Sequence, residues 1–310
     1  MTGLLTLSNQ ILCKKEVLGK SFECEIAGIS TYLFFPIYPA VDDANPIIGI
    51  CNPLCPPEIG ATWKRDGEPL SWGYPMKHPS GDSCVELLAL SVECDKEQVD
   101  DYAKKLYESI NKWEHAFLDY LKLETKQGTE RNKNIGRKTC FLELREERYI
   151  PAVRCRTIFG NIPNSNSFAS EKSIISAIKF ANSGKDVFPE YQMLLSAYEA
   201  RNNNQNRLAI VNASSAIEMC LVGYLRKRCT ELNYDTDWLL EHKFRSLGDR
   251  IRLAKNLDPL FPSDGFSESV VKPRNDVAHN RDISPADITT DALIGSAEIT
   301  LVYFLGGRFY

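Results

Sequence analysis

The sequence lacks a charge excess of one sign and the common phosphate-binding and nucleophile motifs. Its 37 basic and 41 acidic residues give a net charge of −4, which argues against a protein that coats nucleic acid through global basic charge. The first half contains no glycine-rich phosphate loop, no serine-centred nucleophile elbow and no paired-carboxylate signature. Any contact with nucleic acid must therefore come from a local cluster, or from one that oligomerisation creates.

A leader and a long apolar run are also missing from the sequence. Residues 1–7 show no basic region followed by an apolar core. No window approaches the roughly 18 consecutive apolar residues that are typical of a membrane span. We therefore expect a cytoplasmic protein without a membrane contact.

The ten cysteines are interpreted as reduced, mostly buried small hydrophobic residues, because no leader points to an oxidising compartment. Cys51 and Cys55, with His78 and Cys84 further along, offer an alternative as half of a zinc site. Their spacing is irregular and prolines flank them. Packing is therefore the preferred interpretation, and no metal or other cofactor is expected.

Residues 1–160 alternate between apolar runs and turn-rich segments. Short runs rich in β-branched and aromatic residues predict strands at 31–35, 84–92, 141–145 and 153–158. Between 96 and 124, apolar residues recur at helical spacing after Asp95, a plausible N-cap. We predict an α+β domain with a mainly antiparallel sheet. No motif states its function, so it is expected to sense a signal, select a substrate or regulate, with a possible partner or ligand of its own.

The sequence beyond residue 160 reads as helical almost throughout. Residues 161–186 are predicted to form a linker with a connecting helix, because their first part is rich in Asn, Ser and Pro. Apolar residues at helical spacing predict helices at 171–182, 189–202, 206–229, 244–257 and 267–280. Residues 187–310 are therefore expected to fold as an all-α bundle.

The last helix has clear signals at both ends. Ser284 is expected as its N-cap, with Pro285 at the first helical position and Asp287 at the third. It should run to about Phe304, where Gly306 would end it in a left-handed conformation.

Two segments of the helical half resemble the HEPN superfamily, whose small helical bundles often cleave RNA. Within 207–218, Ala216-Ile217-Glu218 is similar to the family's Ala-Ile/Leu-Glu helix. The family's active-site pattern is an arginine, often followed by a polar residue, and then a histidine after a short spacer. Arg274, Asn275 and His279 match this pattern, and the likeness covers roughly 187–305.

The resemblance implies a metal-independent endoribonuclease that acts as a homodimer on RNA, with tRNA as one candidate. Two protomers of the family bring their motifs together across a two-fold axis, which makes the site a composite cleft. His279 would exchange a proton near neutral pH, and Arg274 would hold the phosphate with its fork of donors. Asn275 would orient His279 or bind a phosphate oxygen. In a microbe, such an enzyme would be a toxin or a phage-defence effector.

Nearby polar residues have two interpretations each. Arg226, Lys227 and Arg228 are RNA-binding candidates through phosphate contacts, or they form the solvated end of a helix. Glu218 either lies near the RNA cleft or makes a structural polar contact.

The motif itself also has a structural interpretation. Arg274 and His279 can be a surface arginine and a helix-terminal histidine, since an arginine and a histidine at this spacing also occur by chance in unrelated sequences. Asn275 and His279 are four residues apart and share a helix face. Pro273 removes a backbone hydrogen bond, so Arg274 either follows a kink or starts the helix.

Competing functions follow from these alternatives. The first is the ribonuclease, with the N-terminal domain as its sensor or restraint. The second is a non-catalytic HEPN-like module for dimerisation and nucleotide or RNA binding, in which the N-terminal domain carries the function. The third is an unrelated enzyme in the N-terminal domain, for which the sequence offers no motif.

Overall fold

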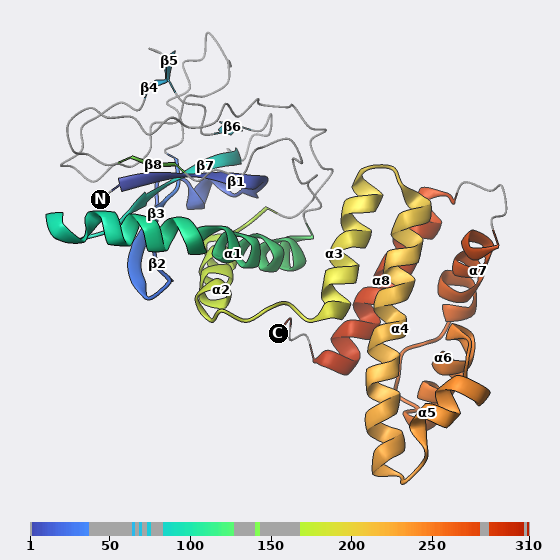
Figure 1. Cartoon of the computed structure of the whole chain (residues 1–310). Coiled ribbons are helices and arrows are strands. Elements are labelled where there is room, and N and C mark those ends of the chain that lie inside the picture. Colours follow the sequence, from blue (N-terminus) through green and yellow to red (C-terminus); the bar gives the residue numbers. More distant parts are fainter. Residues whose placement is uncertain are drawn as a thin grey trace. The chain divides into compact units, whose positions relative to one another are not determined.

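The computed structural model divides into two compact units, Met1–Lys185 and Asp186–Tyr310 (Figure 1). It describes residues 2–36, 64–65, 68–69, 73–75, 83–126, 140–142, 168–279, 285–306 and 309. The predicted strand at 153–158 lies outside these residues, and so do Cys51, Cys55, His78 and Ser284.

The N-terminal unit contains an antiparallel sheet, as predicted, with the strand order β2-β3-β7-β1-β8 and with β6 also paired to β7. Its strands are β1 (Thr2–Cys13), β2 (Ser21–Ile26), β3 (Ile29–Phe34), β6 (Gly73–Pro75), β7 (Ser83–Ser91) and β8 (Cys140–Leu142). A separate hairpin pairs β4 (Lys64–Arg65) with β5 (Glu68–Pro69). The strands predicted at 31–35 and 84–92 correspond to β3 and β7.

The β2–β3 hairpin shows why these residues form strands. Along β2, side chains alternate between exposed and buried, so that Phe22, Cys24 and Ile26 face the core. The hairpin turns through Ala27 and Gly28, which both have positive φ values of 54° and 76°. Such two-residue turns match the right-handed twist of paired strands.

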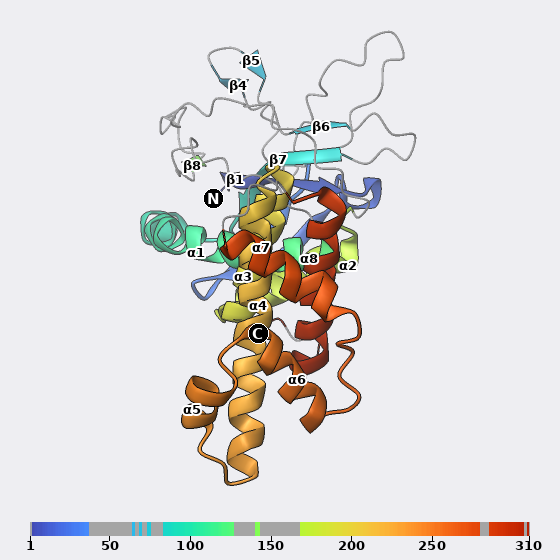
Figure 2. The ribbon, with the colours of Figure 1, turned by 90° about the vertical axis from the view of Figure 1, so that its right-hand side faces the viewer.

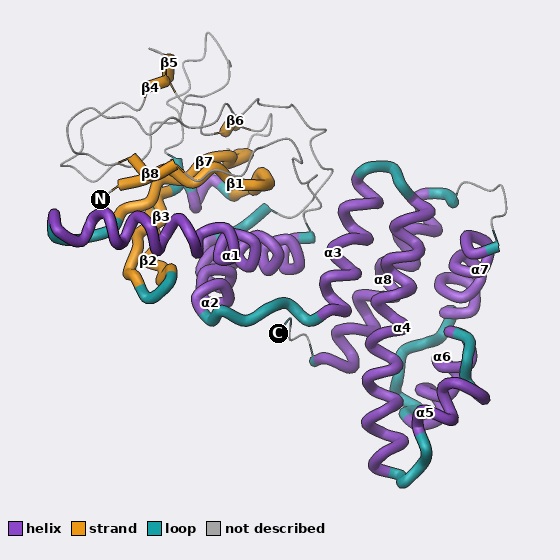
Figure 3. The backbone as a smooth tube through the Cα atoms, viewed as in Figure 1, coloured by secondary structure: helices purple, strands orange, loops and turns teal. Residues whose placement is uncertain are grey.

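The helix α1 (Val99–Thr125) covers one face of this sheet (Figure 3). A 3-10 turn, Lys96–Gln98, precedes it, and the amide of Asp95 donates to Oε1 of Gln98 at 3.2 Å. The buried carboxylate of Glu114 accepts from the backbone amide of Ser8 at 2.5 Å, which ties the helix to β1. Its apolar stripe faces the sheet and includes Leu106, Ile110, Trp113, Phe117 and Leu121.

The helix α2 (Glu171–Asn182) has the predicted bounds, but it is not a connector. Its residues Ile174, Ala177 and Ile178 are buried in the same core as the sheet. Asn182 accepts hydrogen bonds from the indole of Trp113 at 3.0 Å and from the amide of Glu25 at 3.1 Å. Residues 168–185 of the predicted linker therefore belong to the N-terminal unit.

The C-terminal unit is helical across its described residues (Figure 2). It consists of α3 (Pro189–Asn202), α4 (Asn206–Glu231), α5 (Thr236–Trp238), a π-helical turn (Leu239–Lys243), α6 (Leu247–Leu257), a second π-helical turn (Ser267–Val271), α7 (Lys272–Ala278) and α8 (Asp287–Leu305). Helices α3 and α8 are joined by polar contacts. The hydroxyl of Tyr198 donates to Glu298 at 2.6 Å, and Arg201 pairs with Asp291 at 2.7 Å.

The start of α8 differs from the prediction, because the helix begins two residues later. Asp287 is its first residue, and the extended Ala286 occupies the N-cap position without a side-chain bond. The carbonyl of Pro285 accepts a hydrogen bond from the side chain of Asn206 at 2.9 Å, so it serves the contact with α4. Gly306, with φ of 66°, ends the helix as predicted.

Helices α4 and α8 are long and apolar enough to cross a membrane by length and composition alone. Core helices of globular proteins meet the same criterion. One face of each helix is buried within the C-terminal unit, through residues such as Ile217 and Leu221 of α4 and Leu301 of α8. Packing therefore accounts for those faces.

Candidate functional site

The motif residues lie on α7, which continues directly from the π-helical turn Ser267–Val271. The amide of Lys272 donates to the carbonyl of Ser267, five residues back, which marks the wider turn. Pro273 is buried near the start of α7, where a missing amide and a bulky ring disturb the helix least. Arg274 therefore lies in the first turn of α7, immediately after the π-helical turn.

Arg274 and Asn275 lie on this short helix, and His279 lies at its end. The amide of His279 donates to the carbonyl of Asn275 at 3.0 Å, so His279 closes the last turn as the C-cap residue. The guanidinium of Arg274 contacts Oδ1 of Asn275 at 3.4 Å, a long and weak hydrogen bond. Arg274 and Asn275 are half-buried, whereas His279 is exposed. The histidine can therefore meet a ligand while the arginine is partly held in place.

Arg207, which the sequence placed only in the family-like helix, also lies at this site. It is in the first turn of α4, and its guanidinium donates to the carbonyl of Val277 at 3.2 Å. Carbonyls in the last turn of a helix lack a partner within the helix, which is why a cation suits this position. A second guanidinium thus lies at the C-terminal end of α7, close to His279 in the chain fold. Only the long-range contact between Arg207 and Val277 shows that Arg207 belongs to this site.

The predicted RNA-binding arginines do not join this site within one chain. Arg226 lies nineteen residues beyond Arg207 along α4, a separation of about 28 Å at 1.5 Å per residue. Arg226 pairs with Asp237 at 3.5 Å, and Arg228 pairs with Glu231 at 2.5 Å. Lys227 is exposed beside them. The sequence cannot show this separation, because it depends on which end of α4 faces α7.

Glu218 has a structural partner within α6. Its carboxylate forms an ion pair with Arg250, whose side chain is only 16% exposed, while Nε of Arg250 donates to the carbonyl of Phe244 at 3.0 Å. This pair connects α4 with α6. Of the two interpretations from the sequence, the structure gives Glu218 the structural polar contact.

We expect Glu218→Ala to lower the free energy of unfolding by about 1–3 kcal/mol, because it leaves a largely buried guanidinium without its anion. Urea denaturation measures the change. The matched control is Glu231→Ala on the same helix, whose ion pair with Arg228 is more exposed and should cost less than about 0.5 kcal/mol. Equal losses in the two variants would contradict the structural role of Glu218.

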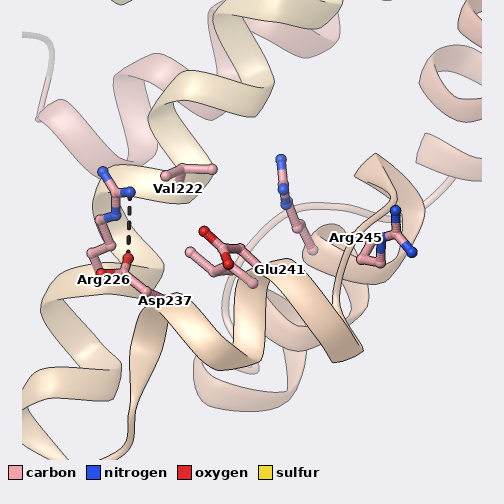
Figure 4. A pocket seen from close by; sticks show the side chains of 7 residues that line it. Val222, Arg226, Asp237, Glu241 and Arg245 are labelled. Carbon is pink, nitrogen blue, oxygen red and sulfur yellow. Dashed lines mark hydrogen bonds and ion pairs between the residues drawn. The ribbon is translucent and has the colours of Figure 1, made fainter.

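A cleft of about 420 Å³ lies at the other end of α4 (Figure 4). Its lining comes from α4, α5, the π-helical turn after α5, the segment before α6, and α6 itself. The lining residues are Val222, Arg226, Asp237, Leu240, Glu241, Arg245 and Arg250. The cleft is thus rich in arginine and is separate from the histidine site.

The described residues offer few other reactive groups. Six cysteine side chains are described, all as free thiols, and five of them are buried. Burial raises the pKa of the Cys220 thiol to about 12, with a smaller contribution from Glu190, so this thiol is a poor nucleophile. Within the described residues, no group of three or more His, Cys, Asp or Glu side chains could hold a metal ion.

Comparisons with known proteins add no family to this geometry. No protein-family model, curated protein or solved structure matches the chain. The function must therefore be argued from the residues themselves.

Proposed function

We propose that this protein is a metal-independent endoribonuclease of the HEPN type. The observation that supports it is the grouping of Arg274, Asn275 and the exposed His279 on α7. The helical character of the C-terminal unit agrees with such a bundle. Arg207, which contacts the end of the same helix, adds a second positive charge.

The chemistry proposed is attack of the ribose 2′-hydroxyl on the adjacent phosphorus. His279 takes the proton from this hydroxyl or gives one to the leaving oxygen, since histidine exchanges protons near neutral pH. Arg274 and Arg207 stabilise the negative charge that grows on the phosphate oxygens in the transition state. The products are a 2′,3′-cyclic phosphate and a 5′-hydroxyl. DNA is spared because it has no 2′-hydroxyl.

Among the described residues, one protomer brings a single histidine, His279, to the candidate site, so the proposal includes a homodimer that supplies a second set of groups. Exposed apolar residues of α4 support a dimer surface next to α7. Leu208, Val211 and Met219 are 48%, 44% and 37% exposed, and their spacing places them on one face of the helix. Leu208 follows Arg207 directly, so this stripe starts beside the candidate site. A second copy that covers the stripe would place its own α7 near α7 of the first copy.

We expect Val211→Glu to convert a dimer into a monomer and to lower RNA cleavage at least tenfold, because it places a charge within the apolar stripe. Sedimentation velocity gives the oligomeric state, and a cleavage assay on the same samples gives the activity. Val302→Glu is the matched control, since Val302 is 53% exposed on α8, outside the stripe. A dimer that survives Val211→Glu would contradict this choice of surface.

Purified protein incubated with total RNA, tRNA or single-stranded DNA, in excess chelator, tests the activity directly. We expect cleavage of RNA, cyclic phosphate ends on the products, and intact DNA. Loss of cleavage on chelation, or equal cleavage of DNA, would contradict the proposed chemistry. Mapping the cut positions in tRNA would identify the preferred substrate.

A further inference from the structure

The arginine-lined cleft is a second candidate site, and the proposed ribonuclease reaction does not use it. It lies about 28 Å from the start of α4, where the histidine site is found, by the rise of an α-helix. Its volume of about 420 Å³ falls within the range of roughly 300–1,000 Å³ that is typical of small-molecule pockets. Its walls come from α4, from the segment that connects α4 to α6, and from α6 (Figure 4).

The charges in the cleft are only partly neutralised by one another. Arg250 is held by Glu218 and by the carbonyl of Phe244. Arg226 and Asp237 are both exposed, and at 3.5 Å they form a loose pair that a ligand can open at little cost. The lining has three arginines and two carboxylates, and Glu218, which pairs with Arg250, brings the sum of these charges to zero.

Two exposed groups of the lining have no protein partner among residues 168–279 and 285–306. The side chains of Arg245 and Glu241 form no hydrogen bond or ion pair there, so one cation and one anion remain available to a ligand. The cleft also has an apolar side, formed by Val222 and Leu240. A ligand that satisfies this arrangement carries a negative group, a hydrogen-bond donor and some apolar surface.

We propose that this cleft binds a phosphorylated ribose, which free nucleotides and RNA both contain. The phosphate lies against Arg245, since a guanidinium group binds phosphate oxygens through paired donors. Glu241 accepts a hydrogen bond from a ribose hydroxyl, a role that carboxylates play in nucleotide sites. The ribose carbons contact the apolar side.

Isothermal titration calorimetry of the full-length chain tests the proposal with AMP, ribose 5-phosphate, inorganic phosphate, and matched RNA and DNA decamers. We expect saturable binding of AMP or of the RNA decamer. Arg245→Ala and Glu241→Gln should each weaken that binding about tenfold. Binding of AMP assigns the site to a free nucleotide, whereas binding of the RNA decamer alone, weakened by Arg245→Ala, assigns it to an RNA chain.

The control variant is Arg252→Ala, because Arg252 lies on α6, is 78% exposed and is paired with Asp249 outside the cleft. Binding that weakens equally in Arg252→Ala and Arg245→Ala reflects general attraction of anions and overturns the proposal. So does the absence of saturation with every ribose-containing probe. His279→Ala should bind as the wild type does, which separates this site from the cleavage reaction.

Discussion

His279→Ala is expected to reduce RNA cleavage by roughly 10²–10⁴-fold, the usual effect of losing a general acid or base. The side chain is exposed at the end of α7, and among the described residues no hydrogen bond to its ring connects it with the fold. The loss should therefore be chemical and not structural. Initial rates on a fluorescent RNA measure it, and circular dichroism confirms that the helices persist.

The matched control is His242→Ala. His242 is also exposed, but it lies in the π-helical turn after α5, where its ring contacts the carbonyl of Trp238 at 3.1 Å. Its removal should leave the cleavage rate within about twofold, because surface substitutions away from a site have small effects. Equal rates for wild type and His279→Ala would exclude the ribonuclease and favour a module that binds RNA without cutting it.

Arg274→Lys separates charge from geometry at the same site. Lysine keeps the positive charge but loses the planar fork that holds two phosphate oxygens at once. We expect it to retain RNA binding and to lose most of the cleavage rate.

In cells, overexpression of the wild type should arrest growth if the protein is a toxin or defence effector, whereas overexpression of His279→Ala or Arg274→Lys should not.

Local sequence patterns predicted much of the helical unit. Helices α2 and α3 have the predicted bounds, because apolar residues recur along them and polar residues or Pro189 mark their ends. The N-terminal sheet was also predictable as antiparallel, since strands such as β2 and β3 alternate in burial and a short turn joins these two. These features depend on residues that lie close together in the sequence.

Features that depend on distant contacts were not predictable. The linker-like composition before α2 hid the fact that this helix completes the N-terminal core. The start of α8 differs from the prediction because Asn206, which is far away in the sequence, binds the carbonyl of Pro285. In the same way, Arg207 joins the candidate site through a carbonyl of α7, and the length of α4 separates Arg226 from it. Each correction comes from a tertiary contact that no local pattern encodes.

The placement of α2 predicts the largest effect on stability. Ile174 is fully buried between α2 and the N-terminal core, whereas its neighbour Ile175 is 38% exposed. Ile174→Ala should lower the free energy of unfolding of the N-terminal unit by about 2–5 kcal/mol, through lost burial and the cavity that remains. Ile175→Ala removes the same atoms from the same helix and should cost less than about 1 kcal/mol.

Hydrogen exchange in increasing urea, read by mass spectrometry, follows the two units separately. Peptides from β7 report on the N-terminal unit, and peptides from α4 report on the helical unit. For Ile174→Ala, the midpoint for β7 should fall while the midpoint for α4 stays constant. A helix that merely connected the units would give small and equal effects for both variants. A fall in the α4 midpoint alone would instead assign α2 to the helical unit.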